Sequence, residues 1–175
     1  MDNNTSPSPD AGNLAQGRRP FALSELFIAD PAFDAPEFWM PFTETVMARP
    51  LWICLQRNMW ANILAAKGAG KVNRHYHPHP VQAYTISGQW GYEEHDWIAR
   101  KGDVLFEPPG IAHTLLAYES DEPMRVFFVV EGPLIWVDDN DQPTGHYDAF
   151  DFYEAARSHF GSNRLGTAYA ESLLR

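Results

Sequence analysis

The sequence is poor in cysteine and in basic residues, and each shortage excludes a class of protein. Cys54 is the only cysteine among 175 residues. No disulfide can therefore form within the chain, which fits a reducing, cytoplasmic compartment. Lys and Arg number 13 against 23 Asp and Glu, for a formal net charge of -10. Nucleic acids and anionic membrane surfaces both select a basic face, so neither is an expected partner.

Long apolar runs are also missing. No stretch reaches the roughly 18 residues that a transmembrane helix needs. The opening M-D-N-N-T-S-P-S-P-D has neither the basic start nor the apolar core of a signal peptide. We therefore expect a cytoplasmic protein that does not associate with membranes.

The 175 residues are enough for one domain with a sizeable core. Short strand-like segments alternate with Gly and Pro turns, which predicts an all-β barrel or sandwich. We assign residues 1–19 to a disordered tail and 20–50 to an N-terminal arm packing on the barrel. Residues 51–140 are assigned to the barrel itself. Residues 141–175 are assigned to a C-terminal helical segment, with helical spacing over 148–159 and Asp148 or Asp151 as the N-cap.

Three histidines carry the strongest chemical signal. His75 and His77 are two residues apart in a strand-like segment, so both side chains project to one face. His113 follows the turn Pro108-Pro109-Gly110 at the start of another apolar strand. Three neutral imidazoles can bind Fe(II), Mn(II), Ni(II), Cu(II) or Zn(II). The alternative is a metal-free barrel in which these histidines have ordinary packing or surface positions.

These two stretches resemble the cupin family. The second cupin motif matches at Gly102, Pro108, Gly110 and His113, with Ala117 at the position of its closing Asn. The first motif matches at its His-x-His pair and its closing glycine, Gly88, while its opening glycine is off by one. Its glutamate position falls on Val81 or Gln82, and neither is a carboxylate. The resemblance implies a small cupin jelly-roll barrel and a metal site formed by the three histidines.

The runs H-Y-H-P-H-P-V-Q-A-Y-T-I-S-G-Q-W-G-Y-E-E-H-D-W and G-D-V-L-F-E-P-P-G-I-A-H-T-L are similar to the 2,4'-dihydroxyacetophenone dioxygenase group of cupins. That similarity implies an Fe(II) enzyme using O2 to cleave the carbon-carbon bond beside a ketone, giving an aromatic acid and formate. Zn, Mn or Ni also suit three histidines. Two alternatives remain: a cupin dioxygenase that cleaves β-diketones, and a non-catalytic zinc-binding sensor like the cupin modules of anti-sigma factors.

Strand alternation provides further candidates around the metal. If a strand runs through residue 94, Glu94 shares a face with Trp90 and Tyr92 and points into the barrel. It would then serve as a labile ligand or a general base, the alternative being a solvated hairpin charge. Gln82 is a candidate for binding the metal or a bound water. Tyr84 would line the pocket with the two rings Trp90 and Tyr92.

The N-terminal arm bears on assembly. Residues 33–42 carry several large aromatic and sulfur-containing side chains among prolines. They can pack against their own barrel or contact a second copy of the chain. We expect a homodimer that acts on a small molecule.

Overall fold

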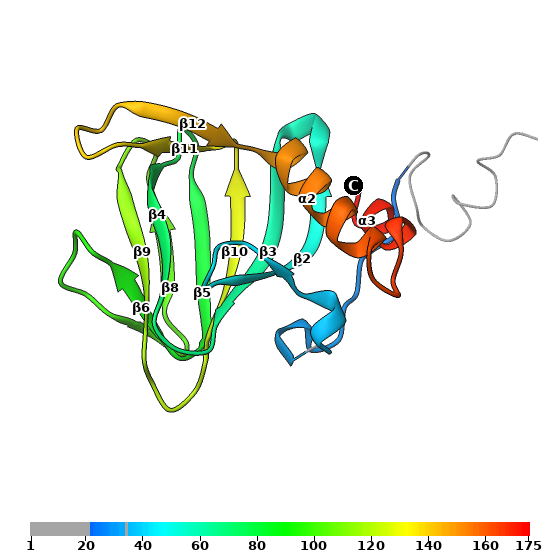
Figure 1. Cartoon of the computed structure of the whole chain (residues 1–175), viewed down its shortest axis with the longest axis horizontal. Coiled ribbons are helices and arrows are strands. Elements are labelled where there is room, and N and C mark those ends of the chain that lie inside the picture. The colour runs from blue at the N-terminus through cyan, green and yellow to red at the C-terminus, as the bar shows by residue number, and fades with distance from the viewer. Residues whose placement is uncertain (1–21, 34) are drawn as a thin grey trace, which may run out of the picture.

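A computed structural model describes residues 22–33 and 35–175 (Figure 1). The predicted tail, residues 1–19, lies outside this part. The described residues form two six-stranded sheets in which all strand pairings are antiparallel. Side chains from both sheets share one large core cluster. The prediction of an all-β jelly-roll barrel with a short C-terminal helical region is confirmed. No helix in these residues is long and apolar enough to cross a membrane.

The first sheet has the strand order β1-β2-β3-β10-β5-β8. Its strands are β1 (Met40–Pro41), β2 (Met47–Cys54), β3 (Met59–Ala66), β10 (Met124–Glu131), β5 (Val81–Ser87) and β8 (Val104–Glu107). The second sheet has the order β12-β11-β4-β9-β6-β7. Its strands are β12 (Pro143–Tyr147), β11 (Leu134–Val137), β4 (Gly70–Tyr76), β9 (His113–Tyr118), β6 (Gln89–Tyr92) and β7 (Ala99–Arg100).

The turn between β5 and β6 depends on glycine. Gly88 has φ of 71°, a left-handed conformation that side chains with a Cβ rarely adopt. A Cβ at this position would lie 2.5 Å from the Met124 backbone. Gly88 therefore lets the chain pass from the first sheet to the second directly against the start of β10.

The C-terminal helices lie beside β2 at one end of the barrel (Figure 1). They are α2 (Ala149–Gly161) and α3 (Thr167–Ser172). The predicted cap is present: the Asp148 carboxylate accepts from the Phe150 and Asp151 amides, and the Asp151 carboxylate accepts from the Asp148 amide. Phe152 is fully buried and stacks on Trp60 of β3, with ring centroids 5.3 Å apart. This contact holds the helix against the core.

The sheets extend beyond the span assigned to the barrel. β1 and β2 begin within residues 20–50, where only short 3-10 turns, η1 (Pro31–Phe33) and η2 (Pro36–Phe38), precede them. A third such turn, η3 (Leu55–Arg57), connects β2 to β3. At the other end, β11 and β12 form a hairpin in a stretch that its acidic, turn-rich composition did not predict as strand. The apolar run of β11 is short, and only pairing with β4 completes its hydrogen bonds.

Candidate metal centre

Three buried histidines meet inside the barrel. His75 lies in β4, His77 lies one residue beyond the end of that strand, and His113 begins β9. The β4–β9 register places His75 directly opposite His113. One potential ligand atom from each histidine lies within 4.8 Å of those of the other two. The structure thus brings together the three histidines that the sequence singled out.

Hydrogen bonding and stacking fix the orientation of two of these rings. His75 Nδ1 lies 2.7 Å from the Asn73 carbonyl oxygen, to which it donates, so its Nε2 is left as the ligand atom. The Tyr92 ring stacks on His113, with centroids 3.9 Å apart and an interplanar angle of 10°. A backbone carbonyl that orients a histidine is a common arrangement in metal sites because it selects the tautomer in advance.

Burial keeps all three imidazoles neutral. Desolvation lowers the pKa of His75 to about 4 and that of His77 to about 2, and the neighbouring imidazoles contribute to the second shift. The pKa of His113 falls to about 3 for the same reasons. Neutral imidazole is the form that binds metal ions, so at neutral pH protons do not compete for these nitrogens.

A carboxylate that the sequence analysis did not single out faces the histidines. Glu107 ends β8 of the opposite sheet and is buried. Its Oε2 lies 3.5 Å from His113 Nε2 and 3.7 Å from His77 Nε2. The Tyr92 hydroxyl donates a short hydrogen bond to Oε1. Oε2 is buried and has no hydrogen-bond partner among the described residues.

Burial also sets the protonation of this carboxylate. Desolvation raises the pKa of Glu107 to about 7, although the hydrogen bond from Tyr92 acts in the opposite direction. The adjacent imidazoles do not lower this pKa because they are neutral themselves. Without a bound metal ion, burial therefore favours the protonated form of Glu107, at the point where the three histidines converge.

The sequence pattern of β8 does not indicate a buried carboxylate. Apolar residues normally face the core, which favours Val104 and Phe106 over Glu107 for the inward face. The structure instead exposes both of these side chains and buries Glu107. The absent first-motif glutamate is thus matched by a carboxylate from the second motif, immediately before Pro108.

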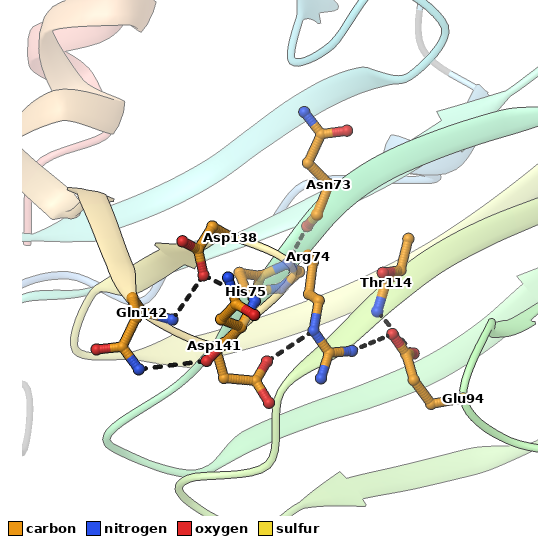
Figure 2. Close-up of polar contacts among 9 residues, drawn as sticks. Asn73, Arg74, His75, Glu94, Thr114, Asp138, Asp141 and Gln142 are labelled. Carbon is orange, nitrogen blue, oxygen red and sulfur yellow. Dashed lines mark hydrogen bonds and ion pairs between the residues drawn. The ribbon is translucent and has the colours of Figure 1, made fainter.

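The predicted position of Glu94 is wrong. β6 ends at Tyr92, so residue 94 lies in a turn and does not continue the strand alternation. The Glu94 carboxylate pairs with Arg74 at 2.5 Å and accepts a hydrogen bond from the Thr114 amide at 2.8 Å; both contacts can be followed in Figure 2. Arg74 also donates to Asp141 at 2.8 Å, which joins the turn to the loop between β11 and β12.

This network also makes Glu94 a poor base. Partial burial acts to raise the pKa of Glu94, but hydrogen bonds from the Thr114 and Glu94 amides, together with the charge of Arg74, outweigh that effect. The pKa of Glu94 is lowered as a result. Glu94 does not line the cavity that contains the histidines.

The four predicted pocket residues divide between inside and outside. Tyr92 lines the cavity with the histidines, whereas Trp90 is fully buried in the core behind it, with its indole donating to Thr85 at 2.8 Å. Gln82 and Tyr84 are exposed on the outer face of β5. The strand turns its small side chains inward, which leaves room for the large rings of β6 and β10.

The cavity itself is small and mostly apolar. Its volume is about 40 Å³, enough for a few water molecules. The polar groups at one end are the three histidines, Glu107 and Tyr92. The apolar wall includes Trp60, Leu64, Val72, Leu115, Phe128 and Val130. Phe42 lines both this cavity and a second, outer pocket formed by residues of the 42–45 segment with Lys71, Asn73 and Trp136.

These residues fit a transition-metal ion. Three neutral imidazoles converge within 4.8 Å, and Glu107 Oε2, a buried oxygen without a hydrogen-bond partner among the described residues, faces two of them. Three histidines can hold Fe(II), Zn(II), Mn(II) or Ni(II) while leaving positions open for a substrate. His79 is exposed and is not part of this cluster.

Comparison with known proteins agrees with this geometry. A family model described as the ChrR cupin-like domain matches residues 34–147. The chain belongs to this cupin family. The match spans both sheets and includes all three histidines and Glu107. A search of curated proteins found no match to this cupin.

Solved structures share the fold. An RmlC-like cupin from Ralstonia eutropha JMP134 has 28% identity and a TM-score of 0.64, covering 77% of this chain and 82% of its own. A second protein from that organism, of unknown function with a cupin-like fold, has 22% identity and a TM-score of 0.62, covering 66% of this chain and 73% of its own. The acetylacetone dioxygenase of Acinetobacter johnsonii has 15% identity and a TM-score of 0.63, covering 78% of this chain and 97% of its own. At such low identities, the last two matches support the fold alone.

Proposed function

We propose that this cupin is a non-haem iron dioxygenase that cleaves the carbon-carbon bond beside the ketone of a small hydroxyketone similar to 2,4'-dihydroxyacetophenone. The observation that carries the proposal is the buried Glu107 carboxylate, whose Oε2 faces two of the three neutral imidazoles and has no hydrogen-bond partner among the described residues. Proton abstraction beside a carbonyl needs a base at such a position.

The three histidines would hold Fe(II) through neutral ligands, which leaves the ion with its full double positive charge. Such an ion, when bound, would supply the electronic route by which O2 reacts with an electron-rich substrate. A hydroxyketone has two adjacent oxygens that can chelate it. Because the protein ligands carry no charge, the site favours a substrate that binds as an anion.

Glu107 would produce that anion. Its Oε1 accepts a hydrogen bond from the Tyr92 hydroxyl. Its Oε2 faces His77 and His113 and has no hydrogen-bond partner among the described residues. Oε2 would accept the proton released when the bound hydroxyketone becomes an enediolate. The apolar walls would exclude water from the activated carbon. Overall, one hydroxyketone and one O2 give one carboxylic acid and one formate, so all atoms are conserved.

The size of the cavity supports a second candidate, a β-diketone substrate. A volume of about 40 Å³ does not admit an aromatic hydroxyketone unless side chains move. Phe42, which separates the cavity from the outer pocket, is the side chain whose rotation would join the two. A compact β-diketone, of the kind acted on by the Acinetobacter johnsonii enzyme, needs less movement. The same base would remove its acidic central proton.

The test combines metal analysis with oxygen uptake. Protein purified without oxygen is analysed for bound metal, reconstituted with Fe(II), and supplied separately with 2,4'-dihydroxyacetophenone and acetylacetone. We expect O2 consumption with one of them, and one formate per O2 from the hydroxyketone. Tightly bound zinc, with no uptake by the iron-loaded protein on either compound, would instead identify a zinc-binding sensor module.

A further inference from the structure

We propose that Asn62 binds a second polar group of the substrate, across the apolar cavity from the metal end. This inference rests on the proposed function and specifies its substrate class further. Asn62 lies in the middle of β3, is 3% exposed, and lines the same cavity as the histidines. Trp60 and Leu64, two residues away on either side, line it as well, so the inward face of β3 carries one amide between two apolar side chains.

The amide oxygen of Asn62 lacks an internal partner. This Oδ1 is buried and makes no hydrogen bond within the described residues. The residues beside it in the sheet are Pro50 on β2 and Phe128 on β10, and neither side chain can donate or accept a hydrogen bond. A buried amide oxygen without a partner destabilises the free protein, because its hydration is lost and nothing replaces it. A ligand that donates a hydrogen bond would supply what the fold does not.

The sheet places this amide away from the metal end. Glu107 lies on β8 at one edge of the first sheet, and β5 and β10 lie between it and β3. The residues between, such as Val81 and Val130, are apolar. The cavity therefore has a metal-binding end, an apolar middle and an isolated amide.

That arrangement matches a substrate with the same three parts. A hydroxyketone head would lie at the histidines, a flat apolar body against the walls, and a hydroxyl at the far end beside Asn62. A phenol para to the ketone meets this description, since an amide can accept from its hydrogen and donate to its oxygen. A simple β-diketone has no polar group to reach Asn62. The residue would accordingly discriminate between the two substrate classes.

The first experiment measures ligand preference. Binding to the iron-loaded protein under anaerobic conditions is followed by calorimetry for 2,4'-dihydroxyacetophenone and for the same hydroxyketone without its 4'-hydroxyl. We expect the wild-type protein to favour the first by at least about 10-fold, because the buried amide would otherwise stay unpaired. Asn62→Leu should bring the two affinities together. Gln82→Leu, which removes an exposed amide from the outer face of β5, should preserve the wild-type ratio.

A second experiment tests the amide without any substrate. If the Asn62 amide oxygen has no internal partner, Asn62→Leu should raise the melting temperature of the ligand-free protein, by about 2–4 °C. A lower melting temperature would show that the amide is a structural group, and would overturn the proposal even if neither compound binds. Equal wild-type affinities for the two compounds, or a preference that survives in Asn62→Leu, would also overturn it. By contrast, a wild-type protein that binds neither compound while Asn62→Leu is stabilised would contradict the proposed substrate and the role of Asn62 in binding it.

Discussion

Glu107 Oε2 lies 3.5 Å from His113 Nε2, although the two residues belong to strands of opposite sheets. The turn at Pro108, Pro109 and Gly110 connects them, so a single short segment delivers both groups to the cavity. The Tyr92 side chain reinforces the pair, since its ring stacks on His113 and its hydroxyl donates to Glu107. Tyr92 therefore holds Glu107 and His113 in place together.

The first prediction concerns metal retention. His75→Ala, His77→Ala and His113→Ala should each lose most of the bound ion, because two imidazoles and no other fixed ligand hold it weakly. His79→Ala is the matched control: the side chain is exposed and outside the cluster, so its loss should leave metal content unchanged. Elemental analysis after gel filtration provides the measurement. Full occupancy in any of the three variants would remove that histidine from the site.

The second prediction concerns the stability of the metal-free protein in acid. Unfolded histidine titrates near 6.5, whereas the folded pKa values are about 4, 2 and 3 for His75, His77 and His113. Between pH 6.5 and 4 the unfolded chain binds up to three more protons at these positions than the folded protein does. The free energy of unfolding therefore decreases as the pH is lowered. Glu107 opposes this with one proton, because its folded pKa of about 7 exceeds its unfolded value. The net effect is a loss of about 2–3 kcal/mol per pH unit near pH 5.

The matched variant for this experiment is His77→Leu, which removes one of the titrating groups. Urea unfolding of the metal-free protein across this pH range should show its slope reduced to about half that of the wild type. Identical slopes would mean that His77 is protonated to the same extent in the folded and unfolded states. The pKa assigned to its buried ring would then be wrong.

Sequence predicted the three histidines because their spacing encodes their geometry. A His-x-His pair in a strand must share a face, and a Pro-Pro-Gly turn before His113 sets where the next strand starts. Asp148 was predictable as a cap for a similarly local reason. Glu107 was not, because its strand buries a carboxylate and exposes Val104 and Phe106, against the usual preference. The prediction for Glu94 was wrong because β6 ends at Tyr92, so the strand alternation does not reach residue 94. Its partner, Arg74, is distant in sequence.

The third prediction concerns the cap of α2. Asp148→Ala should lower the free energy of unfolding by about 1–2 kcal/mol, because two backbone amides at the start of the helix lose their acceptor. Asp139→Ala removes a carboxylate from an exposed loop nearby and should change stability by less than about 0.5 kcal/mol. Denaturant unfolding distinguishes the two. Equal stabilities of the two variants would show that the cap contributes nothing.

The fourth prediction is a homodimer formed through the arm that precedes the barrel. Phe33 is 61% exposed, with the guanidinium of Arg125 lying over its ring, which leaves a large aromatic surface for a second copy. Light scattering at micromolar concentration should give twice the chain mass, and Phe33→Ser should weaken association by roughly 10-fold or more. Phe106→Ser, on the exposed outer face of β8, is the control. A monomeric wild type would contradict the prediction, and dissociation by Phe106→Ser alone would assign the interface to β8.

The most direct test of the account is oxygen uptake per bound iron in the Glu107→Gln and Glu94→Gln variants, at saturating substrate. The amide of Glu107→Gln keeps the shape of the carboxylate but cannot accept a proton. We therefore expect it to retain iron on its three histidines and to lose roughly 100-fold in turnover. Glu94→Gln breaks a surface ion pair with Arg74 and should stay within about threefold of the wild type. A Glu107→Gln protein that turns over at the wild-type rate, or that no longer binds iron, would contradict the assignment of Glu107 as the base.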